Sequence, residues 1–497
     1  MILFIVGLLI LGVGYLVYGR LVEKIFAPDD REVPARELAD GLDYVELPTW
    51  KNKLIQLLNI AGVGPVIGVI GGIKFGSIVF VIIPVGCVLA GAVHDFASGM
   101  ISMRTKGANL TELVRITTGK WVYRFFLAFV TLALLLVVAV FINIPAKLAA
   151  GMIAGGGASA FYWAVGVIFC YYVLATLFPI DQIIGRFYPI FGMMLLAGTL
   201  ILGGVLLYHG CTTPEFLAES AGFKQNMFKA DKVPILPMLF VTIACGILSG
   251  FHATQSPLVA RTIKHEKYAH GVFFGMMVLE GLIAMIWAAG AMAIYNKMPE
   301  LMSKDATLAL VKITSVFLKI EFASTLVIIS VIVLAVTSGD TAMRSLRLSI
   351  AEALHLEQKP IRNRLLLVIP VAAVVTGLLI WSNKDANSFG LLWNYFAWSN
   401  QVLAVFTFVM ATVYLAALRK PTLITVLPGM FITFVVSLYI LWISPEKGGP
   451  VGVGLEYTHA VIVAAFTAVV IFAAALMRGA EMRDNNLWDN KTEKANE

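Results

Sequence analysis

The chain has 497 residues, of which 59% are hydrophobic and only 13% are charged, and its mean hydropathy is +0.87. Soluble domains carry roughly 25% charged residues, so this composition excludes a water-soluble globular protein. The formal net charge of +7 does not indicate nucleic-acid binding, because Lys and Arg lie mostly in loops between apolar segments, as the positive-inside bias of membrane proteins produces.

The first apolar segment begins at the N-terminus and runs to Tyr18. No basic residue precedes it, Arg20 and Lys24 follow it, and no A-x-A-like cleavage site is evident. These features favour a retained first helix that starts outside the membrane, rather than a removable signal peptide.

Apolar blocks of about twenty residues recur along the whole chain. This length crosses roughly 30 Å of hydrocarbon at about 1.5 Å per residue. The blocks are apolar all round, whereas a soluble helical repeat would show amphipathic stripes. We predict an all-α, polytopic membrane protein with about thirteen transmembrane helices, near residues 2–18, 57–73, 76–102, 121–142, 158–178, 187–208, 234–257, 271–295, 322–343, 364–382, 390–418, 421–443 and 457–477.

The charge of the connecting loops predicts the orientation. Connections at 143–157, 383–388 and 444–455 are nearly bare of Lys and Arg. With thirteen crossings every basic loop falls on one side, so we expect the N-terminus outside and the C-terminus inside. The basic connections lie at Arg104 to Arg124, Arg261 to Lys267, Arg344 to Arg364, Arg419 with Lys420, and beyond Arg478.

Two of these spans contain helix-breaking residues. The second span reads Asn59-Ile-Ala-Gly-Val-Gly-Pro-Val-Ile-Gly-Val-Ile-Gly-Gly, and the seventh reads Cys245-Gly-Ile-Leu-Ser-Gly-Phe-His-Ala-Thr-Gln-Ser-Pro. Backbone freed by such residues survives at membrane depth only when it is packed in protein or lines a wet cavity. The two spans are five apart and run in opposite directions, which predicts a five-plus-five inverted-repeat core of the LeuT type. The alternative is that these glycines only allow close helix packing.

This reading divides the chain into seven parts. We expect an extra N-terminal transmembrane helix at 1–20, a cytoplasmic loop at 21–56, a first repeat at 57–208, an extracytoplasmic loop at 209–233, a second repeat at 234–418, two C-terminal transmembrane helices at 419–478, and a polar cytoplasmic tail at 479–497.

Several longer strings resemble the carbon starvation protein A (CstA) family across roughly residues 55–420. They are Gly62-Val-Gly-Pro-Val-Ile-Gly, Gly91-Ala-Val-His-Asp-Phe, Ser249-Gly-Phe-His-Ala-Thr-Gln-Ser-Pro, Glu280-Gly-Leu-Ile-Ala-Met-Ile-Trp-Ala-Ala, Thr337-Ser-Gly-Asp-Thr-Ala-Met-Arg-Ser and Tyr395-Phe-Ala-Trp-Ser-Asn-Gln. The resemblance implies a prokaryotic plasma-membrane carrier for pyruvate or peptides, driven in some members by protons. It also implies membership of the amino acid-polyamine-organocation carriers. The best-known enteric relatives are longer, which leaves the substrate open.

Residues at the two breaks are the candidate substrate site. Freed N–H groups and the positive end of a helix dipole bind a carboxylate well, and nearby side chains would select the rest of the substrate. The alternative for Thr254 and Ser256 is that they only cap a broken helix. The candidates are Gly62, Gly64, Pro65, Gly68, His252, Thr254, Gln255 and Ser256.

Ionisable and hydroxyl side chains inside other spans are the candidates for ion coupling. Such groups cost several kcal/mol in hydrocarbon unless paired or wetted, and a carboxylate beside an imidazole can carry a proton. Asp340 and Arg344 could instead form a plain helical ion pair, and Asn400 with Gln401 could simply crosslink helices. The candidates are His94, Asp95, Glu280, Ser338, Asp340 and Thr341; the last three, with carbonyls from Gly62 to Pro65, would suit sodium.

The sequence therefore predicts a secondary active transporter that imports a small carboxylate, either pyruvate or short peptides, with protons, in a carbon-starvation response. The alternatives are a sodium-coupled amino-acid or peptide carrier, or a membrane-embedded enzyme with a metal or acid–base site at His94, Asp95 and His252. The enzyme is disfavoured because no motif such as HExxH is present, and the cysteines show no metal-type spacing. We expect no cofactor and no nucleic-acid partner; the partners are the substrate, a coupling cation and the bilayer of the plasma membrane.

Overall fold

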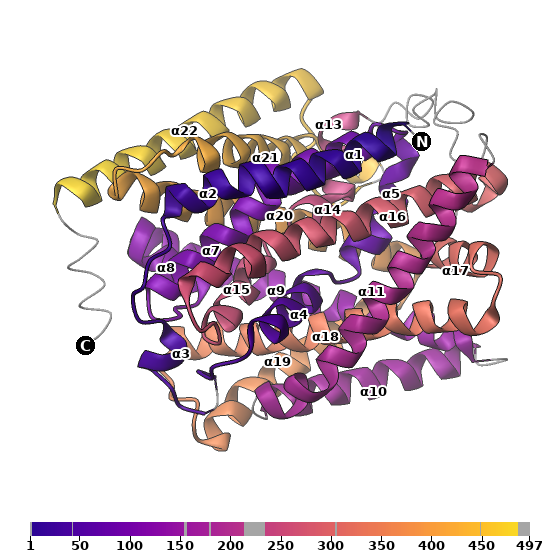
Figure 1. The fold of residues 1–497 in the computed structure, drawn as a ribbon, viewed down its shortest axis with the longest axis horizontal. Coiled ribbons are helices and arrows are strands. Elements are labelled where there is room, and N and C mark those ends of the chain that lie inside the picture. The colour runs from indigo at the N-terminus through magenta and orange to yellow at the C-terminus, as the bar shows by residue number, and fades with distance from the viewer. Residues whose placement is uncertain are drawn as a thin grey trace.

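The computed structural model describes residues 2–41, 43–153, 157–177, 180–212, 234–303, 306–447 and 449–485, and these residues are almost entirely helical (Figure 1). The longer helices are α1 Ile2–Val13, α2 Gly19–Phe26, α4 Thr49–Ile60, α6 Val79–Gly86, α7 Ala92–Arg104, α8 Leu110–Thr118, α9 Lys120–Met152, α10 Gly157–Leu177, α11 Ile180–Thr212, α13 Ile235–Thr242, α15 His252–Ala260, α16 Gly275–Lys297, α17 Ala306–Phe317, α18 Glu321–Ala353, α19 Ile361–Ser382, α20 Ala386–Ala417, α21 Leu423–Trp442 and α22 Tyr457–Asp484. Short elements include α3 Pro34–Glu37, α5 Val69–Gly72 and α14 Ala244–Ile247.

The number of spans agrees with the prediction. In the described part of the chain, eleven helices are long and apolar enough to cross a membrane, and there are thirteen spans if each of two bent pairs counts as one. The bent pairs are Thr49–Ile60 with Gly64–Phe75, at 54°, and Ile235–Thr242 with Ala244–Ala260, at 69°. Both spans are therefore broken as predicted, although the bend of the seventh lies at Ile243, just ahead of the predicted stretch that begins at Cys245. The all-α membrane fold is confirmed.

The second span begins earlier than its apolar block suggested. The block begins near residue 57, but α4 starts at Thr49 and places Asn52, Gln56 and Asn59 on one face at helical spacing. All three side chains are buried. Polar residues on a face that is buried in the protein lower the hydropathy of the segment but do not end the helix. The prediction from hydropathy therefore missed the first two turns of α4.

The first span extends beyond its predicted end at residue 20, because α2 continues it to Phe26. Val22 and Phe26 of this last stretch are fully buried, while Arg20 and Lys24 point away from the core. The helix therefore becomes amphipathic where it leaves the apolar block.

The predicted extracytoplasmic loop lies mostly in 213–233, and the end of the predicted tail lies in 486–497, both outside the described residues.

Two long helices form the support against which the broken helices lie. Helices α9 and α18 each have 33 residues, about 50 Å at about 1.5 Å per residue, and they pack along one another. Helix α1 packs on α6 and α16, whereas α20, α21 and α22 pack together along one edge of the molecule (Figure 1). The broken helices lie between these groups, with α15 packed on α7 and α4.

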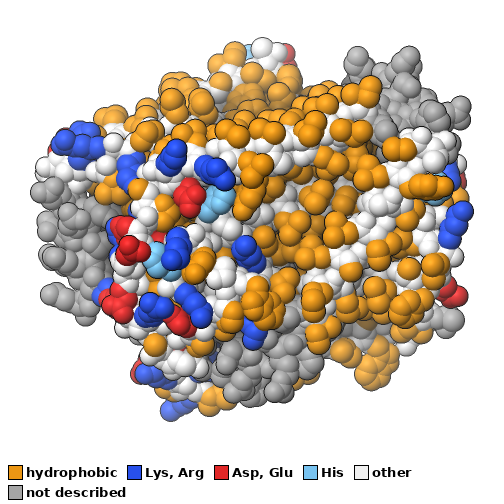
Figure 2. Space-filling model, in the orientation of Figure 1, with side chains coloured by type: hydrophobic (Ala, Val, Ile, Leu, Met, Phe, Trp, Pro, Cys, Tyr) orange, Lys and Arg blue, Asp and Glu red, His pale blue; other side chains and the backbone are white. Residues whose placement is uncertain are grey.

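Surface chemistry matches insertion into a bilayer. Figure 2 shows a broad apolar surface across the middle of the molecule, while most of the Lys, Arg, Asp and Glu side chains in view lie at one end and fewer at the other. We call this end the basic end; it includes Arg104, Lys106, Arg115, Lys120 and Arg261. Aromatic residues are also exposed beside it: Trp121 is 80% and Phe125 63% exposed, as expected for a helix that enters lipid at the interface.

The two broken spans cross in close contact. A Cβ atom added at Gly64, in the π-helical turn Gly64–Gly68, would lie 1.9 Å from Cβ of Cys245, next to the break of the other span. Any side chain at Gly64 would therefore force the two backbones apart. This is a steric reason for glycine in the first broken segment, and it places the two breaks side by side.

Candidate functional site

The site is built around an unwound stretch in the second broken span. Helix α14 ends at Ile247, Leu248 is extended, and α15 begins at His252, so residues 248–251 lie between the two helices. Asn400 of α20 holds this stretch: its Oδ1 accepts from the Phe251 N–H at 2.7 Å, its carbonyl accepts from the Gly250 N–H at 3.0 Å, and its Nδ2 donates to Ser249 Oγ at 2.7 Å. The predicted crosslinking amide thus satisfies backbone groups that hydrocarbon could not.

His252 opens α15 and meets two of the predicted ionisable residues. Its Nδ1 lies 3.1 Å from Asp95 Oδ2, and the other oxygen of Asp95 lies 2.9 Å from His94 Nδ1. The remaining ring nitrogen of His252, Nε2, faces Glu280 Oε2 at 3.7 Å. We call His94, Asp95, His252 and Glu280 the buried relay; none of the four side chains is more than 1% exposed.

The relay joins three different spans. Helix α7 supplies His94 and Asp95, α15 supplies His252, and α16 supplies Glu280. Adjacent residues on a helix point about 100° apart, yet the short Asp95 side chain reaches back to its neighbour and across to α15 at the same time. His94 and Asp95 therefore act as one group with His252.

Glu280 is the least satisfied member of the relay. Neither of its carboxyl oxygens has a hydrogen-bond partner among the described residues, and both are buried. A buried carboxyl group without a hydrogen bond costs several kcal/mol if it is charged, so Glu280 favours a proton of its own or a partner such as water or substrate. The 3.7 Å separation from His252 is within ion-pair reach but longer than a hydrogen bond, so a proton could pass between the two groups only after they move closer.

The predicted polar residues beyond His252 on α15 make mostly local bonds. Thr254 Oγ1 donates to the Phe251 carbonyl at 2.7 Å, and Ser256 Oγ donates to the His252 carbonyl at 3.0 Å. Gln255 Nε2 reaches Ser345 of α18 at 3.2 Å. The two hydroxyls thus donate back to carbonyls of the preceding turn and do not cap the helix. Gln255 connects a broken helix to the long support helix.

The predicted ion-coupling residues of α18 separate from the relay. Ser338 Oγ donates to the Leu58 carbonyl of α4 at 2.9 Å, so it contacts the first broken span near its break. Asp340 Oδ2 instead accepts from Tyr171 of α10 at 2.8 Å, on another side of α18. Thr341 Oγ1 donates to carbonyls of its own helix. The structure therefore brings Ser338, but not Asp340, to the broken span.

The residues Arg344 and Gln401 also bond to neighbouring spans. Arg344 Nη2 donates to the Ala175 carbonyl of α10 at 2.7 Å, so it is tied to the same helix as Asp340. Gln401 Nε2 donates to the Phe240 carbonyl of α13 at 2.8 Å. These contacts anchor the support helices around the breaks.

Of the predicted glycine segment, Gly62 lies in the break itself, and Gly64, Pro65 and Gly68 form the π-helical turn that follows it. All are buried in the described structure. The turn borders Cys245 of the other broken span. These residues shape the crossing point of the two spans.

Gln56 and Asn59 are polar residues that sequence reasoning did not assign to the site. Both are fully buried on α4, and neither end of either amide has a hydrogen-bond partner among the described residues. An unsatisfied buried polar group costs about 1–3 kcal/mol, so two such amides side by side indicate a place for water or ligand. Their signal in the sequence was the spacing of Asn52, Gln56 and Asn59 on one helical face.

A network of ion pairs and hydrogen bonds lies at the basic end of the molecule. Arg104 at the end of α7 donates to both oxygens of the buried Glu266, at 2.9 and 2.8 Å, and to the Tyr414 hydroxyl at 3.0 Å. The Arg31 guanidinium beside Asp29 holds the pKa of that carboxyl well below its usual range. Arg104 also donates to the Ala27 carbonyl at 2.8 Å, so it fastens the loop after α2 to the end of α7 and, through Tyr414, to α20.

Among the described residues, no group of three or more His, Cys, Asp or Glu side chains has the arrangement to hold a metal ion. This applies to the buried relay as well. The arrangement of two imidazoles and two carboxyls suits the binding and movement of protons.

Comparison with known proteins identifies the family. The model of the family described as carbon starvation protein CstA matches residues 1–220 and 160–322, which together are more than half of the chain. An uncharacterized membrane protein of Haemophilus influenzae is 39% identical over 331 residues, covering 58% of this chain and 89% of that protein. The peptide transporter CstA of Bacillus subtilis is 24% identical and covers 96% of both chains. The peptide transporter CstA of Campylobacter jejuni is 27% identical, and the match covers 55% of this chain but only 47% of that protein.

Solved structures show the same fold at low identity. A manganese transporter of Eremococcus coleocola aligns over 89% of this chain and 99% of its own, with a TM-score of 0.54 and 14% identity. MhsT in complex with L-phenylalanine aligns over 86% of this chain and 99% of its own, with a TM-score of 0.58 and 11% identity. These likenesses confirm the LeuT-type fold, and with the family match they make the chain a membrane transporter rather than an enzyme. The chain belongs to the carbon starvation protein CstA family.

Proposed function

We propose that this transporter imports a small carboxylate nutrient, pyruvate or short peptides, together with protons across the plasma membrane of a prokaryote during carbon starvation. The observation that carries the proton coupling is the buried relay, in which two imidazoles and two carboxyls from three spans contact one another. Ionisable groups at such depth are functional candidates by default. The names of the relatives favour peptides within this class.

The relay can hold one mobile proton without creating an isolated charge. With Asp95 ionised and accepting from both imidazoles, a proton between His252 Nε2 and Glu280 is the one that can leave. Protonation of Glu280 removes a buried negative charge, and its loss restores one beside His252. Because His252 starts the helix at the break, this change alters the electrostatics of the unwound stretch. A substrate at that stretch would therefore respond to the proton.

The substrate site proposed here lies where the two broken spans cross. The N–H groups of Gly62 and His252 are bonded within the chain, so a carboxylate would be attracted here by the positive end of the α15 helix dipole. The unsatisfied amides of Gln56 and Asn59 suit a polar group such as a peptide bond. If these amides bind substrate, Gln56→Leu and Asn59→Leu will raise KM for uptake. If they bind nothing, the same substitutions will leave KM unchanged and stabilise the protein by about 1–3 kcal/mol, because an unsatisfied group is removed.

Asn363→Leu is the matched control. Asn363 lies in the first turn of α19, and its side chain donates to the Glu357 carbonyl in the preceding loop. It should leave KM for uptake at the wild-type value. A KM increase of equal size in Asn363→Leu and in the α4 variants would contradict the proposed contact.

Sodium coupling is the second candidate, and one contact favours it. Ser338 Oγ lies 2.9 Å from the Leu58 carbonyl, so a hydroxyl of α18 and carbonyls near the break of α4 already approach each other as oxygen ligands would. If a sodium ion occupies this place, Ser338→Ala will abolish uptake driven by a sodium gradient. Under proton coupling the same variant will keep its response to a pH gradient.

Uptake into proteoliposomes tests the function and the ion together. Purified protein is reconstituted with labelled pyruvate or a labelled dipeptide outside, and either a pH gradient or a sodium gradient is imposed. Proton coupling predicts accumulation above equilibrium with the pH gradient alone, abolished by a protonophore. Downhill flux that is unaffected by either gradient would contradict a coupled carrier.

The proposed orientation, with the N-terminus outside and the basic end inside, can be checked in cells by labelling introduced cysteines.

A further inference from the structure

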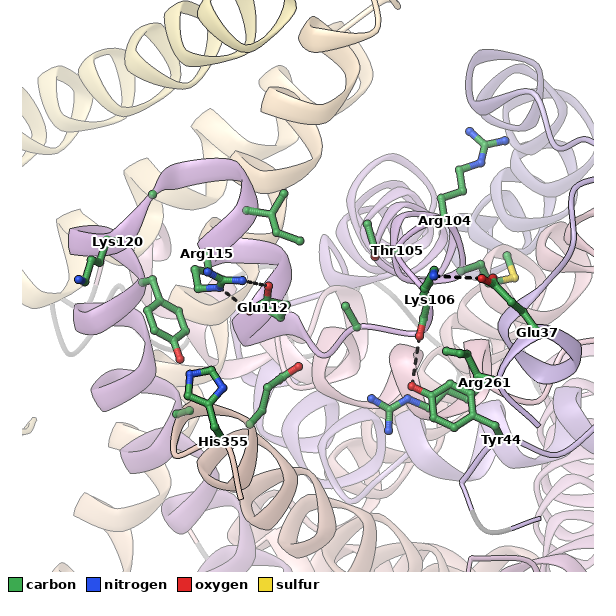
Figure 3. A pocket seen from close by; sticks show the side chains of 18 of the residues that line it. Glu37, Tyr44, Arg104, Thr105, Lys106, Glu112, Arg115, Lys120, Arg261 and His355 are labelled. Carbon is green, nitrogen blue, oxygen red and sulfur yellow. Dashed lines mark hydrogen bonds and ion pairs between the residues drawn. The ribbon is translucent and has the colours of Figure 1, made fainter. Parts of the chain in front are cut away.

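A large cavity at the basic end lies apart from the buried relay and the breaks. It has a volume of about 1020 Å³, at the upper end of the range of roughly 300–1,000 Å³ found for ligand pockets. Its walls come from the loop after α2, the end of α7, α8, the first turns of α9, and the ends of α15 and α18. Figure 3 shows Lys120, Arg115 and His355 on one side of it, with Lys106, Tyr44 and Arg261 on the other.

The cavity is lined by more positive than negative charge. Seven Lys and Arg side chains face four Glu side chains. Several of these groups neutralise one another: Lys106 pairs with Glu37 at 3.1 Å, and Arg115 pairs with Glu112. Lys120 and Arg124 form no ion pair with any described residue, and both are exposed. The unneutralised positive charge is therefore concentrated where α9 begins.

Lys120 and Arg124 are also placed to meet a lipid. They are four residues apart, on one face of α9. Between and beside them Trp121 and Phe125 are 80% and 63% exposed, and the guanidinium of Arg124 lies over the Trp121 ring at 5.2 Å from its centroid. Exposed tryptophan beside basic residues is typical of the membrane–water interface. The mouth of the cavity thus has the composition expected at the membrane–water interface, where lipid phosphates lie.

The inner wall of the cavity is rigid and polar. Arg261 donates to the Gly107 carbonyl at 2.8 Å and to Asn109 Oδ1 at 3.0 Å, while Nδ2 of the same Asn109 donates to Glu352 at 3.0 Å. Burial raises the pKa of the Tyr44 hydroxyl, which stays protonated and donates to the Lys106 carbonyl at 3.1 Å. A molecule bound in the cavity would therefore contact the ends of α15 and α18, which Asn109 joins by hydrogen bonds to Arg261 and Glu352.

We propose that this cavity binds the phosphate-bearing headgroup of an anionic phospholipid, with Lys120 and Arg124 as its phosphate contacts. Lysine and arginine form short, charge-assisted hydrogen bonds with phosphate, and basic pockets between membrane helices favour anionic headgroups. A free phosphate ion shares this chemistry but not the contact with Trp121 and Phe125. The proposal is independent of the substrate and of the coupling ion.

Native mass spectrometry of the full chain in detergent tests the proposal. Phosphatidylglycerol and phosphatidylcholine with the same acyl chains are titrated against wild type, against the double variant Lys120→Ala with Arg124→Ala, and against the control Lys319→Ala with Lys384→Ala. The control removes two exposed lysines from other loops. We expect wild type and control to bind phosphatidylglycerol about tenfold more tightly than phosphatidylcholine, and the α9 variant to lose this preference, because one charge-assisted hydrogen bond is worth about a factor of ten.

Two further arms separate the outcomes. Inorganic phosphate is added in place of lipid, and the thermal unfolding midpoint is recorded; the proposal predicts that phosphatidylglycerol raises the midpoint of wild type but not of the α9 variant. Binding of phosphate without any preference between the two lipids would overturn the lipid assignment. Equal binding of the two lipids, or an equal loss in the α9 and control variants, would overturn it as well. If the double variant does not fold, Lys120→Gln alone is tested against Lys384→Gln by the same criteria.

Discussion

The substitution Asp95→Asn probes the centre of the buried relay while keeping the size of the side chain. The carboxylate accepts hydrogen bonds of 2.9 and 3.1 Å from His94 and His252, and all three side chains are buried. Each hydrogen bond to a charged group contributes about 1.5–3 kcal/mol. Asparagine still offers one acceptor, but its NH2 group faces the second imidazole N–H. We therefore expect the free energy of unfolding to fall by about 3 kcal/mol.

Unfolding of the purified protein by sodium dodecyl sulfate in mixed micelles measures this change. The control is Asp484→Asn, because Asp484 is 61% exposed and its ion pair within the described structure is with its neighbour Arg483. Such a surface change should stay within about 0.5 kcal/mol of wild type. An Asp95→Asn protein as stable as the control would refute the reasoning, since Asp95 would then not hold two imidazoles in the folded protein. We expect Asp95→Asn to lose both stability and the uptake that a pH gradient drives.

Two other contacts give sharp predictions by the same assay. Gly64→Ala should cost about 3 kcal/mol, because its Cβ would meet that of Cys245 at 1.9 Å; adding Cys245→Gly should recover part of the loss, and Gly151→Ala, with open space around it, should be neutral. Equal effects at the two glycines would contradict the close crossing. Glu266→Ala should cost about 3–5 kcal/mol, because it leaves the buried Arg104 guanidinium without its carboxylate. Glu456→Ala, at an exposed pair, should change stability by less than about 0.5 kcal/mol, and a similar loss in both variants would argue against the network at the basic end.

The fold was predictable because the membrane restricts what a sequence can form. Apolar blocks of fixed length, loops sorted by charge and two glycine-rich interruptions five spans apart led to a LeuT-type core with breaks near Gly62 and His252. The structure bends the second span at residues 61–63, but the bend of the seventh span lies at Ile243, and only the non-helical residues 248–251 lie next to His252. Helix boundaries were less accurate where one face of a helix is polar and still buried, as at Asn52 and Gln56.

The composition of the relay was only partly predictable. His94, Asp95 and Glu280 were conspicuous because ionisable residues are rare in membrane spans. Their partners were not predictable, because Asp95 and His252 are 157 residues apart and helical spacing says nothing about which spans touch. The separation of Asp340 from the relay was equally hidden, since the sequence does not tell which side of α18 faces α10.

Polar amides were the main omission. Asn400 was expected to crosslink helices rather than to form part of a site, yet it holds three groups of the unwound stretch. Gln56 and Asn59 were passed over because uncharged amides are less conspicuous than histidine or glutamate. Inside a membrane an amide without a partner is nearly as informative, because no solvent satisfies it.

Glu280→Gln tests the central claim, proton coupling through the buried relay, most directly. Glutamine keeps the shape of Glu280 but cannot exchange a proton with His252, whose Nε2 lies 3.7 Å from the carboxyl oxygen. In proteoliposomes, we expect this variant to exchange labelled for unlabelled substrate across the membrane at near the wild-type rate. It should fail to accumulate substrate when a pH gradient is imposed. Accumulation by Glu280→Gln equal to that of wild type, still abolished by a protonophore, would contradict the account.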